Sequence, residues 1–325
     1  MVIPPNKADL FERGRLAGAQ LHSVSWGGSL NTYGSYDLEF DEYLYENEDF
    51  MIFVAAGNDG ARCPKLRCRN YKDLQYDTSN TVFSPAVAKN VIAVGASNNE
   101  GESKPAWYLK GSDHVAFFSA RGPTADGRSK PDIIAPGYSI LSAGARPNKH
   151  GECDPDANQP FTFKTLNNNA NVGLSIKYGT SMSAPIATGA ATLIRQYFEE
   201  GWYPNGKKTL QNSMRPSGAL VKAVLLNGGR EMYLVQNFLK YTKTKAYDQA
   251  QNFGMISLVD SLSIEGKNEF STMIIDRKQI YNDDTHTYTF LIDNTSCDSR
   301  IELSATLVWV EPAATPGCMA CTLND

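Results

Sequence analysis

The sequence has no block of basic residues, no long apolar run and only four histidines in its 325 residues. It carries 31 Lys and Arg against 35 Asp and Glu, a net charge of −4. This balance gives no sign of a nucleic-acid partner or an anionic membrane surface. The longest apolar run, residues 50–56, is too short to span a bilayer. The first residues, "MVIPPNKADL", show no signal peptide, because no basic region is followed by an apolar stretch.

The six cysteines do not define one pattern, because six cysteines allow 15 pairings. Cys63 and Cys68 lie in one polar stretch and are close enough in sequence to close a small ring. Cys318 and Cys321 form a C-x-x-C pair, but no second pair of metal ligands accompanies it. A metal or redox role, a disulfide and two free thiols all stay open for this pair. Cys153 and Cys297 have no near neighbour of their kind.

The first two-thirds of the chain alternates between helical and buried-strand patterns. Apolar residues at helical spacing predict helices over residues 7–17, 37–49, 181–200 and 217–229. Short apolar runs predict strands over residues 20–26, 50–57, 90–97 and 131–137. Strands that alternate with helices indicate an α/β fold with a parallel sheet.

The pattern changes after about residue 262. Residues 285–292 and 300–310 alternate between apolar and polar side chains, as half-buried antiparallel strands do. We therefore expect two domains, residues 1–262 and residues 263–325. The second is predicted to be the start of a small β-sandwich or jelly roll that is too short to close.

The segment "KYGTSMSAPIATGA", residues 177–190, places serines among small residues at the start of a predicted helix. The free N–H groups and the dipole of a helix N-terminus favour negative charge beside Ser181. Gly179 lets another backbone approach closely, and Pro185 is tolerated in the first turn. These properties suit a nucleophilic serine. The same residues also suit a Ser/Thr cap on a buried helix of small residues.

Five segments occur in an order that distinguishes these two interpretations. "GTSMSAP" (179–185) resembles the nucleophile motif of the subtilisin-like serine proteases, the subtilases, and "VAAGN" (54–58) resembles their oxyanion segment. "SWGG" (25–28) resembles the strand that lines their substrate cleft. Residues 114–137 and 252–262 resemble the block before the nucleophile helix and the end of the domain. The resemblance covers residues 19–262, and the tail resembles the β domain of some secreted subtilases.

The resemblance implies a serine endopeptidase that cleaves polypeptides through an acyl-enzyme. It makes Ser181 the nucleophile and Asn58 the oxyanion donor, together with the backbone N–H of Ser181. It also implies two strand segments that pair with an extended peptide and border its side-chain pocket, formed by Ser25, Trp26, Gly27, Ala55, Ala56 and Gly57.

The sequence departs from the family at the general base. Subtilases have the chain order Asp, His, Ser, yet no D-T-G or D-S-G motif precedes residue 20 and no H-G-T motif occurs anywhere. Asp9 lies in a predicted helix and is expected to be a solvated residue. None of the histidines lies in a suitable context; they are His22, His114, His150 and His286. His150 forms the only His-Gly pair, but a Pro- and Asn-rich loop follows it instead of a helix.

These departures lead to an expectation about the chain as it stands. We expect a subtilisin-like domain that is incomplete at its N-terminus, followed by a truncated β domain, and we expect the chain alone to be inactive. The alternative is a truncated pseudoprotease that binds extended peptides or a protein partner. The sedolisin branch also carries G-T-S, but it uses an aspartate where this chain has Asn58.

The resemblance implies no required cofactor. Calcium sites are common in such proteases, but no compact cluster of Asp and Asn identifies one here, and no metal ligand is assigned. The cysteines and the family together favour an oxidising location such as the cell exterior, although no signal segment is visible.

Overall fold

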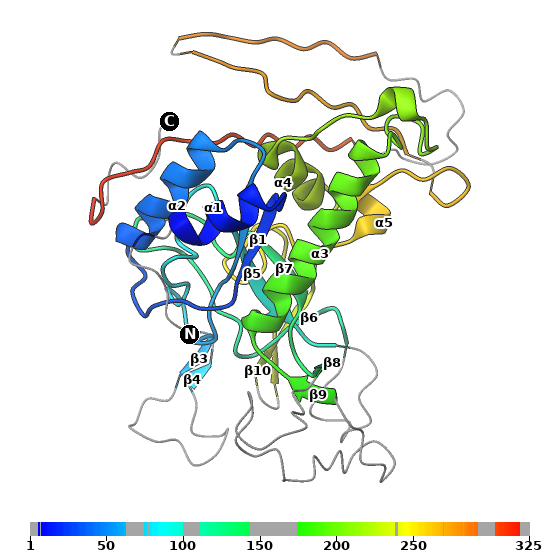
Figure 1. The fold of residues 1–325 in the computed structure, drawn as a ribbon. Helices are drawn as coiled ribbons and strands as arrows, with labels where there is room; N and C mark the ends of the chain where they lie inside the picture. The colour runs from blue at the N-terminus through cyan, green and yellow to red at the C-terminus, as the bar shows by residue number, and fades with distance from the viewer. Residues whose placement is uncertain are drawn as a thin grey trace, which may run out of the picture.

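The computed structural model places a mixed α/β body in the first four-fifths of the chain, followed by extended segments (Figure 1). It describes residues 6, 8–62, 75–76, 78–99, 111–143, 174–237, 240–268, 270–281, 283–291 and 303–318. Within these residues no helix has the length and apolar character needed to cross a membrane.

A mostly parallel sheet forms the centre of the body (Figure 1). β1, β2, β5 and β7 are parallel neighbours in that order. β6 pairs antiparallel with β5 and parallel with β10, and β10 pairs antiparallel with β11. The strands are β1 (Leu21–Val24), β2 (Met51–Ala55), β5 (Ile92–Ser97), β6 (His114–Val115), β7 (Ile133–Pro136), β10 (Leu234–Asn237) and β11 (Lys240–Lys243). The predicted parallel α/β fold is confirmed, and each of the four predicted strands contains one of these.

Helices cover both faces of the sheet, which explains why its central strands are apolar throughout. Successive side chains of β2 point to opposite faces. Phe53 packs in the core that α3 and α4 cover, whereas Ile52 and Val54 pack in the core that α1 and α2 cover. The helices are α1 (Ala8–Leu16), α2 (Ser35–Glu46), α3 (Thr180–Glu199), α4 (Gly218–Asn227) and α5 (Leu258–Ser261).

Three of the predicted helices are confirmed to within two residues, and the fourth is displaced. α2 begins at Ser35 instead of residue 37, because the carboxylate of Asp37 accepts the backbone N–H of Gly34 at 2.8 Å and caps the helix earlier. α1 ends before Gly18, whose φ of +95° is the left-handed conformation expected after a helix. Three short elements complete the fold: the 3₁₀ helix Leu210–Asn212, the hairpin of β3 (Ala61–Arg62) and β4 (Gln75–Tyr76), and the hairpin of β8 (Ile140–Ala143) and β9 (Leu174–Lys177).

The predicted β-sandwich is not shown by the structure. The described residues between 270 and 318 run as extended chain to which no strand is assigned. A strand requires ladder hydrogen bonds to a neighbour, so an alternating pattern alone does not make one. The sandwich and the division at residue 262 stay predictions. Cys318 is in a disulfide, whereas the other cysteines lie outside the described residues.

The end of the chain is bound to the α/β body through Glu311, which is almost fully buried. Its carboxylate forms a 2.8 Å ion pair with Lys89. Its backbone exchanges two hydrogen bonds with the side chain of Asn90, at 2.8 and 3.0 Å. The segment therefore continues the packing of the body although it forms no strand.

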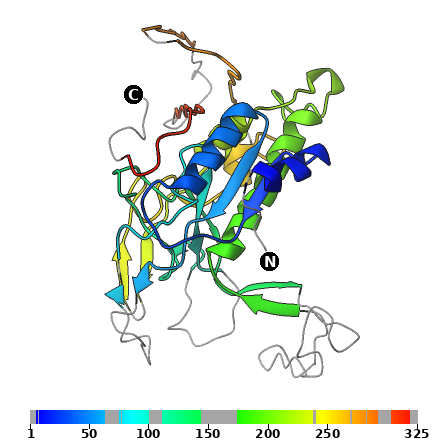
Figure 2. The same cartoon turned by 60° about the vertical axis from the view of Figure 1, so that its left-hand side comes forward.

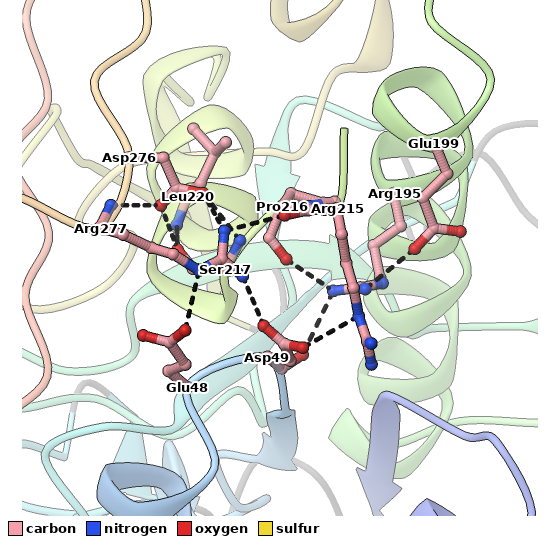
Figure 3. A network of polar contacts seen from close by, with 10 residues as sticks. All are labelled: Glu48, Asp49, Arg195, Glu199, Arg215, Pro216, Ser217, Leu220, Asp276 and Arg277. Carbon is pink, nitrogen blue, oxygen red and sulfur yellow. Dashed lines mark hydrogen bonds and ion pairs between the residues drawn. The ribbon is translucent and has the colours of Figure 1, made fainter. Parts of the chain in front are cut away.

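A second attachment is the polar network around Arg277 (Figure 3). The guanidinium of Arg277 donates to the carboxylates of Glu48 at 2.8 Å and of Asp49. Asp276 accepts the backbone N–H of Ser217 at 3.0 Å, which places a negative charge at the N-terminus of α4. Such a charge stabilises a helix, so the Asp276–Arg277 pair ties the C-terminal segment to α4 and to the turn between α2 and β2.

We predict that Arg277→Ala lowers the free energy of unfolding by about 1 kcal/mol, since these ion pairs are partly exposed. Urea denaturation of the chain measures this loss. Lys278→Ala is the matched control, because it removes the neighbouring exposed cation and should change stability by less than about 0.5 kcal/mol. Equal losses for the two variants would contradict the attachment.

The burial of Asp37 makes the stability of the α/β body depend on pH. Its side chain is fully buried, and burial raises its pKa to about 6 from 3.8. Between these two values the folded state holds a proton that the unfolded chain has lost, so stability falls as the pH rises from 4 to 6. The Asp37 contribution is about 2–3 kcal/mol. Urea denaturation repeated between pH 4 and 6 measures this fall in stability. Asp37→Asn should remove the fall, whereas Glu42→Gln on the exposed side of α2 should retain it.

Candidate active site

The candidate site lies where two parallel strands end and α3 begins. β1 leads directly into residues 25–28, and β2 leads into residues 55–58. The carboxyl ends of parallel strands meet at one edge of a sheet, where α/β proteins place their ligands. The first turn of α3 reaches the same edge, beside the β8–β9 hairpin (Figure 2). The fold therefore brings together three segments that are separated by up to 156 residues.

Ser181 and Ser25 are held against each other by two hydrogen bonds. The Ser181 hydroxyl donates to the backbone oxygen of Ser25 at 3.3 Å. The Ser25 hydroxyl donates to the backbone oxygen of Ser181 at 2.9 Å. Ser181 is half-buried and Ser25 is exposed, so a ligand reaches both. The first cleft segment thus lies beside the candidate nucleophile.

Ser183 has a different environment from Ser181, although only two residues separate them. It is fully buried, and its hydroxyl fills the space beside Gly137, where a Cβ atom would lie only 2.2 Å from it. Within the described residues the Ser183 hydroxyl has no hydrogen-bond partner. Of the two serines, only Ser181 is exposed to a substrate.

Asn58 is oriented by Thr180, the first residue of α3. Its side-chain oxygen accepts the Thr180 backbone N–H at 2.9 Å and the Thr180 hydroxyl at 3.1 Å. That hydroxyl also accepts the backbone N–H of Gly57 at 3.2 Å. These contacts at the amide oxygen fix the Asn58 side chain against the start of α3. Gly179 has φ of +139°, which favours glycine and lets the chain pass close to Asn58.

The predicted substrate-binding residues take different positions. Gly27 is exposed, Gly57 is half-buried, and Ala55 is half-buried at the end of β2. Ala56 is fully buried in the core that α2 covers. The ring of Trp26 packs edge-on against Tyr36 and Phe40, with centroids at 6.0 and 6.1 Å. Trp26 and Ala56 therefore face the protein with their side chains, and only their backbone is available to a peptide.

No described histidine contacts Ser181. His22 packs edge-on against Phe11 at 5.0 Å between centroids, and burial lowers its pKa. His114 packs on Tyr241 at 4.9 Å, and His286 packs near Tyr288. His150 lies outside the described residues. Asp9 is exposed on α1. The described part of the site therefore has a serine and an amide donor, whereas a base is not among its neighbours.

Metal ligands do not gather in the described part of the chain: no three or more His, Cys, Asp or Glu side chains are close enough to share an ion. Sequence reasoning also missed two contributors to the site. Thr180 fixes Asn58, and its place before Ser181 in G-T-S was the available signal. Residues 81–84 lie beside both cleft glycines, and no periodic or motif signal marked them.

Comparisons with known proteins identify the family of this chain. The model of the Subtilase family, Peptidase_S8, matches residues 8–254. The serine protease/ABC transporter B family protein tagD of Dictyostelium discoideum is 30% identical over 299 residues, covering 70% of this chain and 15% of that protein. Serine protease AprX of Bacillus subtilis is 36% identical over 150 residues, covering 45% of this chain and 26% of AprX. The chain thus spans a small part of these relatives.

Solved structures are similar at lower identity. A lanthipeptide protease has a TM-score of 0.48 at 16% identity, covering 78% of this chain and 64% of that one. The prenylagaramide maturation protease PagA has a TM-score of 0.46 at 20% identity, with 78% and 64% coverage.

Proposed function

This chain belongs to the subtilase family, and from that premise we propose that it forms the nucleophile-bearing part of a serine endopeptidase. The observation that carries the proposal is the tether between Asn58 and Thr180, which holds the Asn58 side chain against the residue that precedes Ser181. If the segment around Ser181 were only a cap on a buried helix, it would not need this contact with Asn58, which follows β2. The relatives named as serine proteases support the same reaction class.

In the proposed reaction the Ser181 hydroxyl attacks the carbonyl carbon of the scissile peptide bond and loses its proton to a base. The carbonyl oxygen becomes an oxyanion. The Nδ2 group of Asn58 and the backbone N–H of Ser181 donate to it, and the N-terminus of α3 favours its charge. The protonated base gives its proton to the leaving nitrogen, so that collapse of this tetrahedral state releases the amine fragment and leaves an acyl-Ser181 ester. Water then hydrolyses the ester.

A histidine and an aspartate must complete this machinery, and we propose that the 325 residues alone lack them. A serine without its base is a weak nucleophile. Here the Ser181 hydroxyl donates to a backbone carbonyl, that of Ser25. The same contact supports the second candidate, a pseudoprotease whose cleft segments bind an extended peptide. We propose no cofactor for either function.

A fluorophosphonate probe tests the nucleophile in the gene product extended upstream of Met1. We predict that Ser181→Ala abolishes covalent labelling, because only Ser181 faces the cleft. Ser183→Ala is the matched control and should retain labelling, since its hydroxyl is buried against Gly137. Labelling that survives in Ser181→Ala and disappears in Ser183→Ala would overturn the assignment. An extended protein that binds peptides but takes up no probe would favour the pseudoprotease.

A further inference from the structure

Residues 81–84, called the floor of the proposed cleft below, lie against both of its glycine-containing segments. The backbone oxygen of Ser84 accepts the N–H of Gly28 at 2.7 Å, and it lies 3.1 Å from the place where a Cβ of Gly27 would be. At the other wall the backbone oxygen of Thr81 lies 3.2 Å from the corresponding place at Gly57. Residues 81–84 therefore run from one wall to the other.

Phe83 is the most exposed residue of this floor. Thr81, Val82 and Ser84 are buried, whereas Phe83 is half-buried. Its ring atom Cδ2 lies 3.7 Å from the Cβ position of Gly57, the residue before Asn58. The ring therefore lies beside the segment that carries Asn58.

Arg62 adds a positive charge to this floor. It belongs to β3, four residues after Asn58, and its guanidinium carbon lies 5.3 Å from the centroid of the Phe83 ring. Stacking on a ring face holds a guanidinium in place without using its N–H donors. Arg62 is exposed, so these donors can reach a carboxylate, which an arginine binds with two parallel hydrogen bonds.

We propose that Phe83 and Arg62 together select an acidic side chain immediately before the scissile bond. This inference rests on the proposed peptide cleft and names its substrate class. The guanidinium repels the side chains of lysine and arginine. A glutamate or aspartate side chain that reaches the Phe83 ring pairs with Arg62.

Peptide binding to the chain tests this selection. The probes are succinyl-Ala-Ala-Pro-Glu-amide and succinyl-Ala-Ala-Pro-Lys-amide, titrated calorimetrically at pH 7 into the Ser181→Ala variant so that neither is cleaved. We expect the Glu peptide to bind about tenfold more tightly than the Lys peptide, the combined effect of one attraction and one repulsion at a partly exposed site. Arg62→Glu should invert the ratio. Arg13→Glu, at an exposed cation on α1, makes the same charge change and should preserve it.

The outcomes separate this inference from the proposed function. A Glu-to-Lys ratio that is unchanged by Arg62→Glu overturns the selection by Arg62 while the peptide cleft stands. A preference for the Lys peptide, which the exposed carboxylate of Asp59 on the same turn would produce, also overturns it. Absence of binding by either peptide contradicts the cleft itself and therefore the proposed function as well.

Discussion

Purified chain 1–325 should hydrolyse casein no faster than its own Ser181→Ala variant. The physical reason is the environment of the Ser181 hydroxyl, which donates to the backbone of Ser25 while the described histidines pack on Phe11, Tyr241 and Tyr288. In subtilisin itself, loss of the base from the catalytic triad costs on the order of 10⁶ in kcat, and we expect a loss of the same order here. Release of dye from labelled casein measures the rate.

Extension of the chain should restore this activity. We expect the coding region upstream of Met1 to encode an Asp-Thr/Ser-Gly segment and then a His-Gly-Thr segment, in frame. These would supply the base and its orienting carboxylate. We also expect the extension to add a strand beside β1, because β1 pairs only with β2 within the described residues. Casein hydrolysis by 1–325 that depends on Ser181 would disprove the first expectation and direct attention to His150. A stop codon upstream without these motifs would favour the pseudoprotease.

Replacement of Asn58 by alanine in the extended, active protein should lower kcat by about 10²- to 10³-fold, roughly 3–4 kcal/mol of transition-state stabilisation, with little change in KM. This magnitude is the one established for the oxyanion asparagine of subtilisin and is carried over to Asn58 by family membership. The donor acts only when charge develops on the carbonyl oxygen, which explains why binding of the substrate is spared. Steady-state kinetics on one peptide ester separate kcat from KM.

Thr180→Val provides the graded comparison for Asn58→Ala. It removes the hydroxyl that contacts Asn58 at 3.1 Å but keeps the backbone N–H that contacts it at 2.9 Å. The amide should therefore stay roughly in place, and kcat should fall by about tenfold, the value of one hydrogen bond. An Asn58→Ala enzyme with the kcat of the parent would refute the oxyanion role, whatever Thr180→Val does.

Local pattern alone determined the elements that position the site. The run of buried residues in β2 predicts a strand covered on both faces, and the small residues after Gly179 predict a helix that packs tightly; both are confirmed. The G-T-S motif and the order of five segments indicated the family, which the match over residues 8–254 shows. These features depend on residues that are near one another in sequence, where period and turn chemistry act.

Only the tertiary structure decided which side chains face the cleft. Trp26 belongs to the predicted cleft segment, yet its ring packs on α2, because burial of a large aromatic against Phe40 is favourable and the cleft needs only its backbone. Phe83 and Arg62 carry no motif, and their contact joins the segment before β5 to the segment after β2. Contacts between segments far apart in sequence depend on how the sheet orders its strands, and composition and periodicity do not encode that order.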